Sequence, residues 1–212
     1  MPEEVVTSTA GPSGRKVVIG VTGGIATGKS TVLRMLKELG AETIDADLVY
    51  HDLIRPSGAL IEPLVARFGP KIEADDGGVD RNALGSIVFR DPAALLDLER
   101  LTHPAVLADV RRRIDQSSSP VIAVDAVKLI ESGMSRLCDV VWLVVADPAV
   151  QRHRLMIRNG IDGIEANRRL AAQPDPLTRQ NGADQILDNS GDEDDLRQQV
   201  NDAWNLVPKL TF

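Results

Sequence analysis

The chain has 212 residues, of which 43% are hydrophobic, and a net charge of −7; this size and composition suit one globular domain with its own core. The acidic balance argues against nonspecific binding of nucleic acid, which needs a basic surface, and no run approaches the roughly 18 apolar residues of a membrane span. Cys138 is the single cysteine, so no internal disulfide is possible. We therefore expect a cytoplasmic protein in which this thiol is buried and inert.

The first elements of the chain surround its most informative motif. The polar segment 1–14 is expected to be a disordered tail. The apolar run 17–21 predicts a strand, and the amphipathic run 31–39 predicts a helix that ends at Gly40. Between them, residues 23–30 match the phosphate-binding pattern G-x-x-x-x-G-K-[ST] at every fixed position. A loop with this motif between a strand and a helix predicts a site for a nucleoside triphosphate.

Each residue type in this loop has a chemical role. Glycines let the backbone approach phosphate oxygens closely, and the N–H groups of the loop and of the helix N-terminus face the anion. Lys29 would reach the β- and γ-phosphates, and the Ser30 hydroxyl would bind Mg²⁺. The predicted ATP-binding residues of the loop are Gly23, Gly24, Ile25, Ala26, Thr27, Gly28, Lys29, Ser30 and Thr31.

Four further runs predict strands, at 42–45, 121–125, 140–145 and 184–188. Nearly continuous apolar strands that alternate with helical segments indicate a parallel sheet covered on both faces. The expected fold class is therefore α/β, with a parallel five-stranded sheet flanked by helices in the P-loop nucleoside-triphosphate-hydrolase and kinase fold. We expect a single domain over residues 15–208.

The connection between the second and third strands is far longer than an ordinary crossover. It predicts a helical insertion over about 48–118, at the edge of the sheet where ligands bind. Helical patterns occur within it at 60–68, 82–89 and 93–114, and a bend is expected at Pro104.

A second insertion, over about 148–182, contains six arginines and no lysine. Arginine binds phosphate through two parallel hydrogen bonds and stabilises charge during phosphoryl transfer, so this segment predicts a mobile lid. Arg154 and Arg158 are four residues apart and share a helix face. The alternative is a solvated basic face balanced by acidic neighbours. Asp162 and Glu165 resemble a capping box at the start of another helix.

Two carboxylates follow predicted strands and are candidates for chemistry. Asp47 lies just after the second strand, where open α/β sheets bind ligands, and could orient an acceptor hydroxyl and accept its proton. The alternative for Asp47 is an N-cap of the next helix. Asp125 ends the third strand and could belong to the Mg²⁺ site, or it could be a turn residue after the strand.

Several motifs together resemble the dephospho-CoA kinase family. They are the phosphate loop with its flanks, Asp45-Ala46-Asp47, His103-Pro104, and the segments 151–155, 169–173 and 188–191. The resemblance covers about residues 17–207. It implies ATP-dependent phosphorylation of the ribose 3′-hydroxyl of dephospho-CoA to give CoA, and a nucleoside-kinase-like core with a helical CoA-binding region and a lid.

The resemblance also implies roles for individual residues. It makes Asp47 the candidate base and implies that Lys29 serves ATP and that Asn189 lies near the adenine. With the arginine-rich segment, the expected catalytic residues are Asp47, Lys29 and Arg154. The acceptor-binding residues would be Asp47, His103, Asp125 and Lys128. The Mg²⁺ ligands would be Ser30 and Asp125, the latter directly or through a water molecule.

One segment departs from the pattern of this family. The family's Asp-x-Pro-Leu-Leu-x-Glu is replaced at 125–131 by a sequence with Val127 for the proline and Lys128 for the first leucine. Lys128 could offer a cation to a phosphate of the acceptor, or the change could weaken acceptor binding. Two alternatives therefore stay open: another P-loop small-molecule kinase, with a nucleotide or sugar acceptor, and a catalytically impaired nucleotide-binding homologue. The sequence leaves the oligomeric state open.

Overall fold

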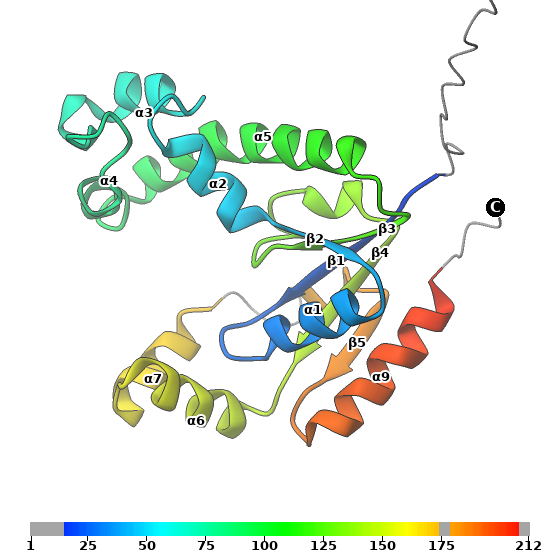
Figure 1. The fold of residues 1–212 in the computed structure, drawn as a ribbon. Coiled ribbons are helices and arrows are strands. Elements are labelled where there is room, and N and C mark those ends of the chain that lie inside the picture. Colours follow the sequence, from blue (N-terminus) through cyan, green and yellow to red (C-terminus); the bar gives the residue numbers. More distant parts are fainter. Residues whose placement is uncertain (1–14, 174–178, 208–212) are drawn as a thin grey trace, which may run out of the picture.

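The structure, a computed structural model, describes residues 15–173 and 179–207. At its centre is a five-stranded parallel sheet with the strand order β2-β3-β1-β4-β5 (Figure 1). The strands are β1 (Val17–Gly23), β2 (Glu42–Asp45), β3 (Val121–Asp125), β4 (Val140–Val145) and β5 (Gln185–Asp188). The expected fold class and the five expected strands are confirmed.

The strand order brings the functional loops to one edge of the sheet. Because the strands are parallel, all of their carboxyl ends lie on the same side. In the register of the sheet, Asp45 at the end of β2 is level with Asp125 at the end of β3, and Asp125 is level with Val21 of β1. The phosphate loop leaves the central strand β1, so it emerges between the ends of β3 and β4, with the acidic residues on its β3 side.

Helices cover both faces of the sheet (Figure 1). On one face, α1 (Lys29–Glu38) and α9 (Glu193–Leu206) pack on the side chains of Ile19 and Trp142. Leu196 and Val200, four residues apart on α9, are fully buried in this core. Gly40, after α1, has a positive φ of 99°, as expected for a left-handed residue that ends a helix.

The opposite face carries α2 (Ala46–Ile54) and α5 (Pro92–Gln116), and β1 contributes Val18 to this second core. The alternation of Val18 and Ile19 between the two cores is the period-two pattern of a strand that is buried on both sides. Helix α5 runs unbroken through Pro104, where the missing N–H removes one hydrogen bond of the helix.

The long connection between β2 and β3 forms a helical arm, which we define as residues 46–116, α2 to α5. It includes α3 (Ile61–Phe68), the 3₁₀ helix η1 (Pro70–Ile72) and α4 (Arg81–Val88). Leu64, Ile72 and Leu84 are among the residues of its own apolar core. The helical patterns expected in this segment are therefore confirmed, and the arm extends away from the sheet (Figure 1).

The arginine-rich segment begins with α6 (Pro148–Asn159) and α7 (Gly163–Ala171), and the 3₁₀ helix η2 (Met134–Leu137) precedes β4. Half of the expected capping box is present, because the Asp162 side chain accepts a hydrogen bond from the Glu165 backbone N–H at 2.8 Å. The Glu165 carboxylate does not return that contact. It pairs instead with Arg168 and Arg169.

Parts of the sequence predictions fall outside the described residues. They are the tail 1–14, the lid residues 174–178 and position 208. Within the part of the chain that the structure describes, no helix has the length and apolar character needed to cross a membrane.

Cys138 is partly buried, and burial, helped by the neighbouring Asp139, raises the pKa of its thiol to about 12. This thiol is therefore inert near neutral pH, as expected.

Candidate active site

The phosphate loop connects β1 to α1, and its shape depends on Gly28. This residue caps α1 with a φ of 95°, a conformation that glycine adopts at little cost. A Cβ atom there would lie 1.9 Å from Nδ2 of Asn189. Inside the loop, the Thr27 hydroxyl donates a hydrogen bond to the Gly24 carbonyl at 3.0 Å. The sequence of the loop therefore enforces a tight turn that leads directly into a helix N-terminus.

Asn189 links the end of β5 to this loop. Its side chain is buried, and its Nδ2 donates a hydrogen bond to the Thr27 carbonyl at 2.8 Å. Its Oδ1 accepts from Nη2 of Arg154 at 3.4 Å. Through these contacts its side chain ties the phosphate loop to the arginine of α6. The place of Asn189 near the adenine, which the family resemblance implies, stays a prediction.

A cavity of about 870 Å³ opens in front of the loop, and we call it the nucleotide cavity. Of the predicted ATP-binding residues, all but Gly23 and Thr27 line it; Gly23 lies in β1 and Thr27 is buried within the loop. Its basic lining residues are Lys29, Lys128, Arg154, Arg158 and Arg179. The Nη1 atom of Arg154 is buried without a partner among the described residues, so this guanidinium keeps a donor free for an anion.

The lid arginines differ in their partners. Arg154, Arg158 and Arg179 line the nucleotide cavity, whereas Arg168 and Arg169 are paired with Glu165. Hydrogen bonds from these two guanidinium groups lower the pKa of Glu165 to about 2. The alternative interpretation, a solvated basic face balanced by acidic neighbours, holds for Arg168 and Arg169. The other three arginines face the cavity, and the lid stays a prediction.

Three carboxylates, those of Asp45, Asp47 and Asp125, lie at or just after the ends of the neighbouring strands β2 and β3. Asp45 caps α2, because its side chain accepts hydrogen bonds from the backbone N–H groups of Asp47 and Leu48 at 2.8 and 3.1 Å. The proposed capping role of Asp47 is therefore wrong. The N-cap must precede the first helical turn, and Asp47 already lies within that turn, exposed to solvent.

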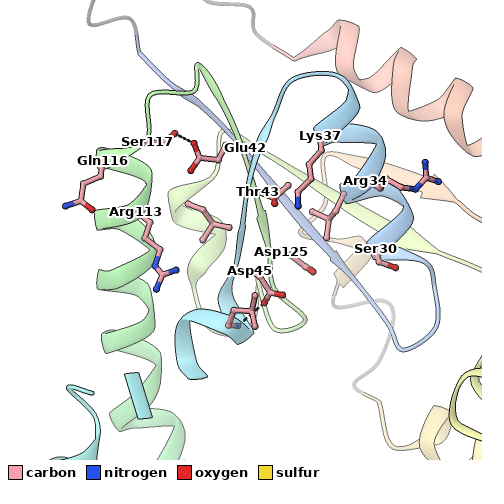
Figure 2. A pocket seen from close by; sticks show the side chains of 13 residues that line it. Ser30, Arg34, Lys37, Glu42, Thr43, Asp45, Arg113, Gln116, Ser117 and Asp125 are labelled. Carbon is pink, nitrogen blue, oxygen red and sulfur yellow. Dashed lines mark hydrogen bonds between the residues drawn. The ribbon is translucent and has the colours of Figure 1, made fainter. Parts of the chain in front are cut away.

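Asp125 is the most perturbed of these carboxylates. Burial raises its pKa to about 6; the ammonium group of Lys29 opposes this rise, and the charges of Asp45 and Asp47 add to it. Its Oδ1 atom is buried and lacks a hydrogen-bond partner within the described residues. Figure 2 shows Asp125 and Asp45 at adjacent strand ends, facing the start of α1, where Ser30 lies. Both Ser30 and Asp125 line the nucleotide cavity.

These residues fit a Mg²⁺ ion that arrives with a nucleotide. Among residues 15–173 and 179–207, no group of three or more His, Cys, Asp or Glu side chains could hold a metal ion by itself. Mg²⁺ usually binds one or two protein oxygens and takes its other ligands from substrate phosphates and water. The unpartnered oxygen of Asp125 and the hydroxyl of Ser30 meet that limited requirement.

A second cavity, of about 380 Å³, lies between α2 and α5 of the helical arm and the segment that follows β3. We call it the acceptor cavity. Asp47 and His103 line it, together with a face of α5 that includes Leu95, Glu99 and Thr102. The two cavities share Val127 and Lys128, so they adjoin at the loop that follows β3. The remaining lining residues are Ala46, Tyr50, Leu98, Val106, Ala126, Ser132 and Met134.

The structure thus separates the residues that were expected to bind the acceptor. Asp47, His103 and Lys128 share the acceptor cavity, and Asp125 lines only the nucleotide cavity of the two. Asp125 lies at the end of β3, level with the central strand. Asp47 follows the edge strand β2 by two residues.

Two contacts of this site were not predicted from the sequence. The Gln173 Oε1 atom accepts a hydrogen bond from the Ile25 backbone N–H at 2.6 Å, which joins the end of the described lid segment to the phosphate loop. Arg179 is buried and pairs with Glu131 at 3.1 Å. Gln173 belongs to a segment on which the family resemblance rests, but neither position has a local pattern that predicts its partner.

Comparison with known proteins decides the family. A model of the family described as "Dephospho-CoA kinase" matches residues 17–195. This chain belongs to the dephospho-CoA kinase family. The expected enzyme class, an ATP-dependent phosphotransferase, is thereby confirmed. A dephospho-CoA kinase from Symbiobacterium thermophilum is 44% identical over 190 residues, covering 88% of this chain and 80% of the relative. One from Geobacter sulfurreducens is 41% identical, covering 88% and 96%.

Solved structures agree with this family assignment. A crystal structure of a protein from Thermus thermophilus has a TM-score of 0.77 at 27% identity, covering 92% of this chain and 100% of that one. The dephospho-CoA kinase from Campylobacter jejuni has a TM-score of 0.65 at 27% identity, covering 89% and 95%. A shikimate kinase from Bacteroides thetaiotaomicron, at 14% identity and a TM-score of 0.55, shares the P-loop kinase fold.

Proposed function

We propose that this enzyme transfers the γ-phosphoryl group of ATP to the ribose 3′-hydroxyl of dephospho-CoA, giving CoA and ADP, the last step of coenzyme A biosynthesis. The observation that carries the proposal is the adjoining pair of cavities, one lined by the phosphate loop and the other by Asp47. Phosphoryl transfer needs a triphosphate and an acceptor hydroxyl held in line, with charge stabilisation around the transferred group.

On the ATP side, residues 24–26 and 28–31 would hold the triphosphate, and Gly23 and Thr27 would shape the loop. Asn189 would lie near the adenine. The N–H groups of the loop and the N-terminus of α1 favour an anion. Lys29 and Arg154 both line this cavity, and they would stabilise the negative charge that spreads over the phosphoryl oxygens in the transition state. The free Nη1 atom of Arg154 supports this role.

On the acceptor side, Asp47 would orient the ribose hydroxyl and accept its proton late in the transfer. Because Asp45 caps α2, the Asp47 carboxylate is not needed for capping and remains available. His103 and Lys128 would contact other parts of the acceptor, while the apolar residues of the arm would cover it. Asp125 would contact the acceptor from the nucleotide cavity, close to Val127 and Lys128, which line both cavities.

Mg²⁺ would be held by Ser30 and Asp125, the latter directly or through a water molecule. When bound, the ion would neutralise phosphate charge and orient the β- and γ-phosphates. The raised pKa of Asp125, about 6 because of its burial, leaves this carboxyl largely ionised near pH 7.5, which suits a cation ligand.

The division of the chain follows the same roles. We infer a single domain over 15–208, in which the insertion at about 48–118 binds the acceptor and the segment at about 148–182 is a lid that excludes water during transfer. The cytoplasmic location stays a prediction, supported by the single cysteine.

An acceptor panel tests the proposal. The protein is incubated with ATP and Mg²⁺ and, in turn, dephospho-CoA, AMP, CMP or gluconate, and ADP release is followed. We expect turnover with dephospho-CoA and little with the others. The Lys29→Ala variant controls for contaminating kinases. Absence of turnover with dephospho-CoA contradicts the proposal; turnover with another acceptor favours a different small-molecule kinase, and ATP binding without any turnover favours a catalytically impaired homologue.

A further inference from the structure

A salt bridge lies at the boundary between the two cavities. Lys128, on the loop after β3, contacts Glu99 of α5 through Nζ and Oε1. Lys128 lines both cavities, and Glu99 lines the acceptor cavity. The pair therefore joins the helical arm to the wall that separates the two substrates.

Lys128 has a special position in the acceptor cavity. Within the described residues, it is the only lysine or arginine that lines this cavity, whereas Asp47 and Glu99 both contribute carboxylates. Dephospho-CoA carries a diphosphate bridge, so it would bring negative charge toward a cavity that already holds two carboxylates. The ammonium group of Lys128 could compensate the charge of the acceptor, but in this structure it is already paired with Glu99.

The structure assigns to Glu99 a role as a displaceable counter-ion of Lys128. We propose that an anionic phosphate of the acceptor displaces Glu99 from its ion pair with Lys128. The pair would thereby set the affinity for the acceptor and favour charged over neutral acceptors. The inference rests on the proposed function and adds to it Glu99, a residue that the family resemblance did not assign. It concerns this chain's own Lys128, which stands where the family pattern has leucine.

The geometry of the pair suits such an exchange. The side chain of Lys128 is 50% exposed and that of Glu99 is 28% exposed, and exposed ion pairs of this kind contribute little to stability. A phosphate group offers Lys128 full negative charge and several acceptor oxygens. The exchange leaves Glu99 without its partner beside the bound anion, which lowers acceptor affinity relative to a chain without this carboxylate.

Steady-state kinetics of Glu99→Gln, Lys128→Met and the double variant test the proposal. We expect Glu99→Gln to lower KM for dephospho-CoA about threefold, since it removes a competing ion pair. Lys128→Met should raise this KM about tenfold, since it removes a charge-assisted contact. In each case kcat and KM for ATP should change less than KM for dephospho-CoA. The double variant should match Lys128→Met, because Glu99 acts through Lys128.

The matched control is Asp97→Asn, which breaks another exposed ion pair of α5, that of Asp97 with Arg67, at a residue that lines neither cavity. It should leave both KM values unchanged. Thermal melting of every variant checks that the fold is retained, as expected for exposed pairs.

Two kinetic results overturn the inference while the proposed function stands. One is turnover of dephospho-CoA with the same KM in Glu99→Gln as in the unmodified protein. The other is a KM that Glu99→Gln lowers equally with and without Lys128, which would mean that Glu99 acts by direct repulsion. Absence of turnover by the unmodified protein is a separate failure, that of the proposed function, and the inference fails with it.

Discussion

Replacement of Asp125 by asparagine should make the protein more stable at neutral pH while removing a residue of its proposed magnesium site. The substitution keeps the size of the side chain and removes its charge. Asp125 is mostly buried at the end of β3, and burial is the largest cause of its raised pKa, ahead of the opposing effect of Lys29. A buried carboxylate without compensating hydrogen bonds costs free energy in the folded state.

The magnitude follows from the pKa. A rise from the ordinary value of 3.8 to about 6 corresponds to an upper bound of about 3 kcal/mol in the free energy of unfolding at pH 7.5. Solvent reaches part of the carboxyl group, so we expect about 1–2 kcal/mol. Because the folded state holds this proton more tightly than the unfolded state, the Asp125 contribution falls as pH rises from about 4 to about 6 and is then constant.

The assay is urea unfolding of the unmodified protein and of Asp125→Asn at pH 5 and pH 7.5, without nucleotide or Mg²⁺. The stability gain of the variant should be roughly twice as large at pH 7.5 as at pH 5. Asp75→Asn, at an exposed loop position, controls for general effects of charge removal. A variant that is less stable than the unmodified protein at pH 7.5, or a gain that does not change with pH, would refute the reasoning.

Three further substitutions test the site. Lys29→Ala should lower kcat at least about 100-fold, because it removes a cation from the transferring phosphoryl group; a small effect on steady-state turnover contradicts that role. Asp47→Asn should leave calorimetric ATP binding unchanged and lower kcat about 100-fold or more, and near-normal turnover would exclude Asp47 as the base. Gln173→Ala removes the hydrogen bond to the Ile25 N–H, so KM for ATP should rise about fivefold. A lower KM would instead mean that Gln173 competes with the nucleotide for that N–H.

Some parts of the site follow from local sequence alone. The phosphate loop can be predicted because its glycines, lysine and serine lie close together in the chain, between a strand and a helix. The spacing of the buried Leu196 and Val200 on α9 and the left-handed Gly40 are equally local features. In each case the physical constraint acts within a few residues, so the pattern predicts the structure.

Other parts of the site could not be predicted from local sequence patterns. Whether Asp45 or Asp47 caps α2 depends on a shift of two residues in the start of the helix, and sequence patterns do not resolve helix ends that finely. Only the hydrogen bonds that the Asp45 carboxylate accepts from two backbone N–H groups of α2 show that Asp47 does not cap this helix. Likewise, the perturbed pKa of Asp125 depends on how β2 and β3 are aligned in the sheet.

The sequence by itself determined the fold class, the phosphate loop and the family, because glycine positions, hydrophobic periods and contiguous motifs are properties of the chain. Tertiary structure alone decided which distant residues meet: Asn189 with Thr27, Gln173 with Ile25, and Lys128 with Glu99. These contacts join segments separated by 162, 148 and 29 positions. Only the order of the parallel strands and the packing of the helices bring such segments together at one edge of the sheet.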